Sequence, residues 1–515
     1  MHTIIHGDCL EELKKLEDNS VDAVITDPPY GLSNTKPAQV ADVLAAWVTG
    51  DTEKVPAKRG GFMGKDWDSF VPPPAVWAEC MRVLKPGGHM AVFAGARTQD
   101  LMGLSIRLAG FEIRDTLGWV YGSGFPKSMD ISKAIDKRRD EDLEPQARVA
   151  KWLVDRMAEK GMTRKNISDH FNAANVAQQW TTYWTDGAVK PRVPKWDQWQ
   201  ELKRLLEFSD EMDAEVWRLN GRKGTPGEAW EKREVTGVYE QPSAANEWAA
   251  NYRGSKRAGA KERRDIPATS EAAKWDGWGT ALKPAIEPII LARKPLDGTV
   301  ANNVLAHGVG GLNIDACRVA TGDTLSIGSG KPAFASDFSG SNPGTQNPAG
   351  RFPANVLLDE HAAKEMDEQS GWQKDGTAVR RNRKNSEANP NGIYSSHVRE
   401  AEPDQTFGSG GGASRFFPVF KYQAKAPKKE RPVIEREDGS KIQHPTVKPL
   451  ALMEWLATLV TPEGGLVLDP FAGTGTTLQA ATNKGFHPIG IEADADYIQL
   501  IHQRMEGGEQ STRNN

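Results

Sequence analysis

The 515-residue chain has few cysteines and no long apolar run. Its three cysteines, Cys9, Cys80 and Cys317, are far apart, so they fit neither a metal-ligand spacing nor a disulfide framework. No stretch approaches the ~18 apolar residues that mark a membrane-spanning helix, and the first residues lack the basic-then-apolar pattern of a secretory signal. We therefore expect a protein of the reducing cytoplasm, without a membrane segment and without a bound metal.

An excess of positive charge is also missing. The net charge is -4, which excludes a uniformly basic nucleic-acid-binding chain. Positive charge is instead concentrated in residues 251–264, 379–384 and 421–431. One such cluster alone is ordinarily a solvated loop. Three clusters outside the predicted core indicate a role in tracking phosphate groups.

What the chain does contain is a series of short apolar runs that are typical of buried strands. Several are followed by segments with helical spacing, such as residues 74–84, which end at a Lys-Pro-Gly-Gly stop. Strands that alternate with helices predict an α/β fold with a doubly wound, mostly parallel seven-stranded sheet. The predicted strands are residues 3–6, 21–26, 89–94, 113–120, 287–292, 466–468 and 488–491.

Two stretches interrupt this alternation and are too long to be loops of a compact domain. Each is predicted to be an inserted unit. The catalytic core would then be discontinuous, with a short tail after it. The predicted parts are a core segment 1–135, a helical insert 136–275, a core strand region 276–295, a second insert 296–440, a core segment 441–507 and a tail 508–515.

The first insert has apolar residues at helical spacing. Within it, residues 147–208 resemble the small helix-turn-helix domains of phage-repressor type. A helix over 173–180 would then present amide side chains to the major groove, where amides can read adenine edges. The alternative is a helical packing insert that never contacts bases. The amides in question are Asn172, Asn175, Gln178 and Gln179.

The second insert is rich in glycine, serine and proline over 322–350 and has a glycine run at 408–412. This composition indicates flexible loops around a small ordered core. Loops held on a rigid scaffold often carry recognition, so we expect this insert to contribute to target recognition.

A glycine turn near the C-terminus is the first motif that carries chemistry. A predicted strand enters Asp469-Pro470-Phe471-Ala472-Gly473-Thr474-Gly475-Thr476 and continues as a helix. Glycines let the backbone approach a ligand closely, and a helix N-terminus favours an anion. A second strand then ends at Glu492, whose carboxylate can accept hydrogen bonds from both ribose hydroxyls. Strand, turn, helix, strand and acid together predict a nucleoside-cofactor site.

A polar tetrapeptide near the N-terminus, Asp27-Pro28-Pro29-Tyr30, is the second motif. The strand before it would deliver it to the carboxyl edge of the sheet, where doubly wound folds bind ligands. The prolines fix the backbone, and the Asp27 carboxylate and the Pro28 carbonyl can both accept hydrogen bonds from one amino group. Tyr30 offers a ring for stacking on a base. Taken alone, the tetrapeptide is also compatible with an ordinary turn.

Together these motifs resemble those of the S-adenosylmethionine-dependent DNA amino-methyltransferases. His6-Gly7-Asp8-Cys9 is similar to the family's opening motif, and His444-Pro445-Thr446-Val447-Lys448-Pro449 is similar to the segment before its glycine loop. The catalytic motif precedes the cofactor loop, which is the permuted order of the β class. The resemblance covers about residues 1–135, 276–295 and 441–507. It implies a Rossmann-like methyltransferase sheet in which strands 21–26 and 466–468 are neighbours.

The resemblance also implies a role for each matching residue. Asp27 and the Pro28 carbonyl would hold the target amino group, with Pro29 stiffening the turn and Tyr30 stacking on the flipped base. Asp8 and the adjacent Cys9 would approach the cofactor's adenine, and Glu492 its ribose. Thr446 and Lys448 would lie near its methionine end. The residues that would wrap the cofactor are Asp469, Phe471, Ala472, Gly473, Thr474, Gly475 and Thr476.

The implied partner is double-stranded DNA, and the implied reaction is direct, in-line methyl transfer to the amino group of a base extruded from the duplex. Hydrogen bonds accepted from that group favour a localised nitrogen lone pair, so neither a covalent intermediate nor a metal is required. In this family Asp at the position of Asp27 usually accompanies adenine N6, and Ser accompanies cytosine N4. Adenine is therefore favoured, and cytosine N4 is the alternative. Homodimers are common in the class and are a further expectation.

Two other functions stay open. One is a helix-turn-helix DNA-binding regulator with a vestigial methyltransferase body. The other is a protein glutamine methyltransferase, against which Asp27 in place of Asn and the motif order both argue. Beyond the Asp27 motif no second catalytic constellation indicates a nuclease, so the residues do not say whether the chain works alone or within a restriction system.

Overall fold

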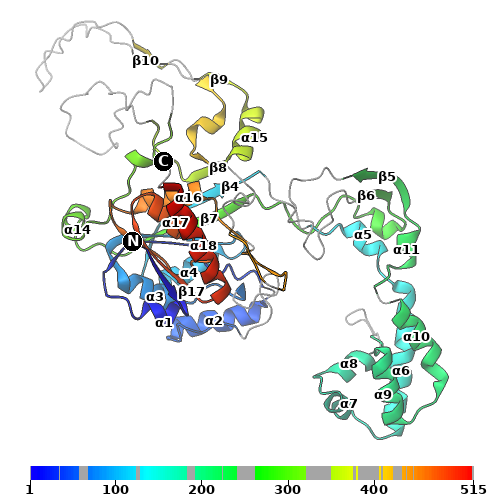
Figure 1. The fold of residues 1–515 in the computed structure, drawn as a ribbon. Helices are drawn as coiled ribbons and strands as arrows, with labels where there is room; N and C mark the ends of the chain where they lie inside the picture. Colours follow the sequence, from blue (N-terminus) through cyan, green and yellow to red (C-terminus); the bar gives the residue numbers. More distant parts are fainter. Residues whose placement is uncertain are drawn as a thin grey trace, which may run out of the picture. The chain divides into compact units, whose positions relative to one another are not determined.

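The computed structural model divides into two compact units (Figure 1). Residues 1–124 and 284–515 form the first, here called the sheet unit, and residues 125–283 form the second, here called the insert unit. The structure describes residues 2–33, 35–56, 68–122, 128–182, 192–222, 224–240, 261–320, 350–374, 378–380, 405–407, 410–420, 432–436, 438–444 and 446–512. The side chains of the three basic clusters predicted to track phosphates lie outside the described residues, as does most of 322–350.

The sheet unit is built on one nine-stranded sheet in the order β1-β17-β16-β2-β3-β7-β4-β8-β13. It contains all seven predicted strands and is mostly parallel, which confirms the predicted α/β class. The seven are β1 (Thr3–His6), β2 (Val21–Thr26), β3 (Leu84–Phe93), β4 (Glu112–Val120), β7 (Ile286–Arg293), β16 (Leu466–Asp469) and β17 (His487–Glu492).

Two further strands make the predicted number of seven too low. β8 (Val356–Asp359) pairs in parallel with β4, and β13 (Val419–Phe420) pairs with β8. Both come from the second predicted insert. They are short, and two to four residues carry almost no periodicity, so their strand signal is weak. Burial of Leu357 and Leu358 against the edge of the sheet stabilises this extension.

The centre of the sheet brings distant segments together at one edge. β16 and β2 are parallel neighbours, with Val467 opposite Ala23 and Leu468 opposite Val24, as the resemblance implied. Their carboxyl ends, which carry the two motifs, therefore share an edge. β7 runs antiparallel to both β3 and β4, and Ile289 lies opposite Phe93. The beginning of β7 consequently reaches the edge at which the parallel strands end.

Helices cover both faces of the sheet because side chains of the central strands alternate between two apolar clusters. Val24 and Met90 belong to one cluster, and Ile25 and Ala91 to the other. The first cluster is covered by α1 (Cys9–Leu13), α2 (Pro37–Thr49), α3 (Pro74–Val83) and α4 (Gln99–Leu108), and the second by α16 (Leu450–Val460) and α17 (Thr476–Asn483). The sheet unit also contains α14 (Val300–His307), α15 (Glu360–Ser370) and α18 (Ala495–Thr512), with short strands β9 (Gln373–Lys374), β10 (Ala378–Arg380), β11 (Gln405–Phe407), β12 (Gly410–Gly411), β14 (Ile434–Glu435) and β15 (Lys441–Ile442).

The insert unit has its own core, made largely of aromatic and leucine side chains such as Trp152, Trp199 and Leu202. Five helices surround it: α6 (Leu143–Glu159), α7 (Arg164–His170), α8 (Val176–Thr181), α9 (Trp196–Leu206) and α10 (Asp213–Gly221). Beside them lie α5 (Ile131–Asp136), α11 (Glu228–Glu231), α13 (Ser270–Ala273) and the hairpin of β5 (Glu234–Glu240) and β6 (Lys261–Ile266).

The predicted helix-turn-helix corresponds to α7 and α8. α8 begins at Val176, three residues later than predicted, because Asn172 and Asn175 both adopt the left-handed conformation, with φ of 46° and 62°. Asparagine tolerates this conformation better than most residues, which lengthens the turn. Among the helices that the structure describes, none is long and apolar enough to cross a bilayer.

Candidate active site

The tetrapeptide Asp27-Pro28-Pro29-Tyr30 leaves β2 at the carboxyl edge of the sheet and is held from both sides. Thr98 Oγ1 donates a hydrogen bond to the Tyr30 carbonyl at 2.6 Å, and the N–H of Gly31 donates to the Asp68 carboxylate at 2.8 Å. Gly31 has a φ of +66°, and a Cβ there would lie 2.7 Å from the backbone of the segment opposite. Only glycine fits, so the loop is fixed in one conformation.

Four side chains from three separate parts of the chain meet beside this loop. Lys448 Nζ lies 2.8 Å from Asp27 Oδ2, 3.0 Å from the Tyr30 hydroxyl and 3.2 Å from Glu287 Oε2. The Tyr30 hydroxyl lies 2.8 Å from Asp27 Oδ1 and 3.4 Å from Glu287 Oε2. We call these four residues the charge cluster. Its two carboxylates are partly exposed, with 22% of the Asp27 side chain and 28% of the Glu287 side chain accessible, whereas Lys448 is buried.

The surroundings fix the charge state of two members of the cluster. Burial opposes the ammonium of Lys448, but attraction by Asp27 and Glu287 outweighs it and raises the Lys448 pKa above its usual value. Burial, followed by the negative charges of Asp27 and Glu287, raises the pKa of Tyr30 well above its usual value. Lys448 is therefore charged and Tyr30 is neutral at physiological pH.

The glycine loop at the end of β16 lies at the same edge. The buried Asp469 carboxylate accepts hydrogen bonds from Thr26 Oγ1 at 2.6 Å and from the N–H of Phe471 at 3.1 Å. It thus ties the loop to the last residue of β2. Burial raises the pKa of Asp469 to about 6. Gly473 and Gly475 have φ of 54° and 74°, and Gly475 begins α17.

Glu492 ends β17 next to the glycine loop. One carboxylate oxygen accepts from the N–H of Gly473 and the other from the N–H of Asp494, both at 2.8 Å. A carboxylate has about four lone-pair sites, so Glu492 keeps acceptor capacity for two hydroxyl groups. Burial raises its pKa to about 7. This arrangement fits the predicted ribose contact.

The opening motif reaches the same place through strand pairing. β1 pairs with β17 so that His6 lies opposite Glu492, and Asp8 follows two residues later. The Asp8 carboxylate accepts from the N–H groups of Leu10 and Glu11 at 3.0 and 3.3 Å and caps α1. Burial raises the pKa of the adjacent Cys9 to about 12, so its thiol is protonated.

The segment before α16 divides between the two parts of the site. The N–H of Thr446 donates to His444 Nδ1 at 3.2 Å, and the imidazole of His444 lies over Gly473. Lys448, two residues further on, reaches Asp27. The prediction placed Thr446 and Lys448 together near the methionine end of a cofactor. The structure puts the ammonium of Lys448 against the predicted catalytic carboxylate, and the contact of both residues with a cofactor stays a prediction.

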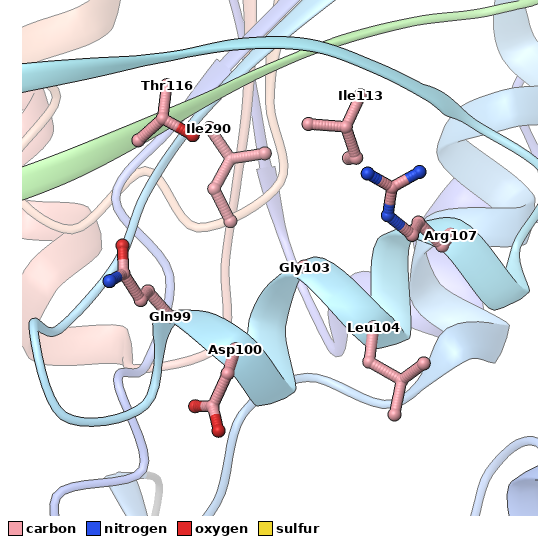
Figure 2. Close-up of a pocket in the computed structure, with 8 residues that line it drawn as sticks. All are labelled: Gln99, Asp100, Gly103, Leu104, Arg107, Ile113, Thr116 and Ile290. Carbon is pink, nitrogen blue, oxygen red and sulfur yellow. The ribbon is translucent and has the colours of Figure 1, made fainter.

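A separate cavity of about 390 Å³ lies away from these residues, between α4 and strands β4 and β7 (Figure 2). None of the predicted site residues lines it. Its lining residues are Gln99, Asp100, Gly103, Leu104, Arg107, Ile113, Thr116 and Ile290. We therefore place the functional site at the sheet edge and not in this cavity.

Sequence reasoning missed three residues that shape the site. Glu287 joins the charge cluster, Thr26 anchors Asp469, and Thr98 holds the tetrapeptide. A carboxylate inside an otherwise apolar run was a signal for Glu287, because charged residues are rarely placed in a buried strand without a partner. No pattern in the sequence pointed to Thr98.

The geometry shows an α/β protein in which the Asp27-Pro28-Pro29-Tyr30 loop and the glycine loop lie at one edge of the sheet. The chain belongs to the DNA methylase family, whose model matches residues 21–503. S-adenosylmethionine is the cofactor that goes with this family, and the glycine loop and Glu492 fit it.

Curated relatives match over shorter stretches. The chain is 42% identical over 64 residues to the type II methyltransferase M2.DpnII of Streptococcus pneumoniae, which is 12% of this chain and 24% of that protein. It is 35% identical over 77 residues to the type II methyltransferase M.ScaI of Streptomyces caespitosus, or 15% of this chain and 25% of that protein. The matches thus span about a quarter of each relative's length.

Solved structures resemble the chain only distantly. The complex of M1.HpyAVI with its cofactor has a TM-score of 0.32 at 12% identity, over 98% of this chain and 99% of that one. PvuII DNA methyltransferase, described as cytosine-N4-specific, also has a TM-score of 0.32 at 12% identity, over 97% and 85%. Scores this low carry no argument, so the fold assignment rests on the sheet itself.

Proposed function

We propose that the protein transfers a methyl group from S-adenosylmethionine to the N6 amino group of adenine in double-stranded DNA. One observation carries the proposal: the Asp27-Pro28-Pro29-Tyr30 loop and the glycine loop, 440 residues apart in sequence, share one sheet edge. An amino-group acceptor beside a nucleoside site is the arrangement that such a transfer requires.

In this proposal each residue of the loop has a defined task. The Asp27 carboxylate and the Pro28 carbonyl accept hydrogen bonds from the two N–H groups of the target, which localises the nitrogen lone pair. Tyr30 presents its ring to the extruded base, and Pro29 keeps the turn rigid. The bound cofactor supplies a methyl group that is already activated on a sulfonium. The proton that leaves the product nitrogen passes to Asp27 or to water.

The cofactor contacts follow from the surroundings of the glycine loop. Glu492 accepts from the ribose hydroxyls, while Asp8 and Cys9 lie on the adenine side. The loop from Asp469 to Thr476 encloses the cofactor, and Thr446 and Lys448 lie near its methionine end. The spare acceptor capacity of Glu492 and the left-handed glycines Gly473 and Gly475 support this assignment.

We also propose that the insert unit contacts DNA. Asn172, Asn175 and Gln178 are exposed at α8 and the turn before it, while Ala177 and Trp180 of the same helix face the core. Exposed amides on a short helix after a turn suit the reading of adenine edges. Homodimerisation remains an expectation from the family resemblance, and a cytoplasmic location remains one from the few, separated cysteines.

The test is methyl transfer from labelled S-adenosylmethionine to DNA of mixed sequence, followed by digestion to nucleosides and mass spectrometry. We expect N6-methyladenine, and single-base sequencing of the product will identify the site. If the product is N4-methylcytosine, the target base is cytosine, which is the alternative to adenine. No incorporation into any DNA would overturn the proposal and favour a DNA-binding regulator. Asp100→Ala, on exposed α4 of the same unit, is the control that should retain activity.

A further inference from the structure

Glu287 is a second carboxylate beside the predicted catalytic Asp27. It stands near the start of β7, the antiparallel strand whose beginning reaches the edge where β3 ends. Its Oε2 lies 3.2 Å from Lys448 Nζ and 3.4 Å from the Tyr30 hydroxyl. Glu287 therefore contacts the same two groups that contact Asp27.

The charges in this cluster do not cancel. Asp27 and Glu287 each contribute one negative charge when ionised, Lys448 contributes one positive charge, and Tyr30 is neutral. The other near neighbour of the ammonium is the ring of Phe93, with its centroid 4.8 Å from Nζ. A net negative charge is thus left beside the loop that would receive the target amino group. Without Glu287, the pair of Asp27 and Lys448 would be neutral.

We propose that Glu287 is a positioning residue for methyl transfer, because it shares the Lys448 ammonium and so leaves Asp27 with net negative charge toward the target amino group. This inference rests on the proposed function. It assigns Lys448 a second partner, so that Asp27 can accept a hydrogen bond from substrate without leaving a buried ammonium unpaired.

The charge movement during transfer explains why this matters. The methyl group moves from a positively charged sulfonium to a neutral amino nitrogen, so positive charge develops at that nitrogen until its proton leaves. A pre-arranged negative cluster stabilises the developing charge, whereas a neutral ion pair does so far less. Because Glu287 draws the ammonium partly away from Asp27, its loss should leave Asp27 a weaker acceptor and lower the rate by roughly 10- to 100-fold.

A purely structural role for Glu287 predicts a different effect of its substitution. If Glu287 only held the edge of the sheet together, its loss would lower stability whether or not Lys448 were present. If it acts through Lys448, its effect must vanish when Lys448 is removed. The two roles are therefore separated by a double-mutant cycle.

The experiment compares Glu287→Gln, Lys448→Met and the double variant under saturating cofactor. We expect Glu287→Gln to lower kcat by roughly 10- to 100-fold, with the KM for S-adenosylmethionine changed less than about 3-fold. The double variant should be no slower than Lys448→Met alone. An unchanged kcat for Glu287→Gln, or losses that multiply in the double variant, would overturn the inference.

A matched control is available on the neighbouring strand. Glu112 of β4 forms an ion pair with Arg293 at 2.7 Å, at the far end of β7 from Glu287. Glu112→Gln also removes one carboxylate from a β7 ion pair, and it should retain the native kcat. A loss in this variant equal to that of Glu287→Gln would show that the effect is general weakening of the sheet and would also overturn the inference.

A second measurement does not depend on methyl transfer. Competitive acylation at a series of pH values, followed by mass spectrometry, reports the pKa of Lys448. Because Glu287 helps to raise this pKa, Glu287→Gln should lower it and Glu112→Gln should leave it unchanged. An unchanged Lys448 pKa in Glu287→Gln would overturn the inference that Glu287 shares this ammonium with Asp27. If the native chain methylates no DNA, the proposed function fails on its own test, while this titration still decides whether Glu287 shares the Lys448 ammonium.

Discussion

A cation lies between two carboxylates at Arg233 in the insert unit and at Lys448 in the sheet unit, and these two clusters differ in exposure. In the insert unit, Arg233 lies 2.5 Å from Asp136 and 2.8 Å from Asp265, and all three side chains are at most 1% exposed. In the sheet unit, the side chains of Lys448, Asp27 and Glu287 are 10%, 22% and 28% exposed. Both clusters consist of one cation and two carboxylates, but only the cluster of the sheet unit is accessible to a ligand.

The partners of the carboxylates explain the difference. Asp136 also accepts hydrogen bonds from Thr269 Oγ1 at 2.7 Å and from the N–H of Ala268 at 2.9 Å, so its acceptor sites are filled by the protein. It joins α5 to the turn before α13. Among the described residues, Asp27 accepts hydrogen bonds from the Tyr30 hydroxyl and the Lys448 ammonium, and it lies at the sheet edge. The Asp27 carboxylate can therefore still accept a hydrogen bond from a ligand, whereas the Asp136 carboxylate cannot.

The strongest test of this comparison is Asp27→Ala. We expect methyl transfer to fall by roughly 10³- to 10⁴-fold, because the main acceptor for the target amino group is lost. Cofactor affinity, measured by calorimetry, should change less than about 3-fold. Full activity in this variant would show that the charge cluster of the sheet unit has no role in methyl transfer.

Arg233→Met should act on stability and not on chemistry. It leaves Asp136 and Asp265 buried without their cation, which destabilises the insert unit by about 3 kcal/mol. Chemical denaturation followed by tryptophan fluorescence measures this change. Arg204→Met, at an arginine that is 76% exposed, is the control and should be nearly neutral. If Arg233→Met weakened cofactor binding as well, the separation of the two clusters would be wrong.

A smaller effect is expected from pH on cofactor binding. Burial raises the pKa of Glu492 to about 7, so its carboxylate is lost as the pH falls through 7. Since only the carboxylate is a strong acceptor for the ribose hydroxyls, affinity should drop roughly 10-fold between pH 8 and pH 6. Glu492→Gln should bind more weakly and show no such slope. A native affinity that does not vary over this range would contradict the assignment of Glu492.

The smallest expected effect concerns the surface of the insert unit. Replacing Asn175, Gln178 and Gln179 by alanine should lower DNA affinity or change site preference, by roughly 3- to 10-fold in a binding titration at fixed salt. Gln146→Ala on α6 is the control. Unchanged affinity and site choice in the triple variant would favour the alternative, a packing insert that does not read bases.

Much of the fold could be predicted because its signals are local. The seven predicted strands are apolar runs bounded by turn residues, and each is present in the sheet. The short strands β8 and β13 were missed because two to four residues carry almost no periodicity. The start of α8 was misplaced because two asparagines adopt left-handed angles that pattern matching does not detect.

The candidate site divides in the same way. Asp27, Tyr30, Gly473, Gly475 and Glu492 stand in recognisable motifs, and the sequence by itself determined the class of chemistry they suit. Only the tertiary structure decided that the Lys448 ammonium contacts both Asp27 and Glu287. The physical reason is that a motif is a property of neighbours along the chain, whereas an ion pair depends on distance in space. The direction of β7 sets the distance between Glu287 and Lys448, because this strand runs antiparallel to β3. No residue near Glu287 indicates that direction.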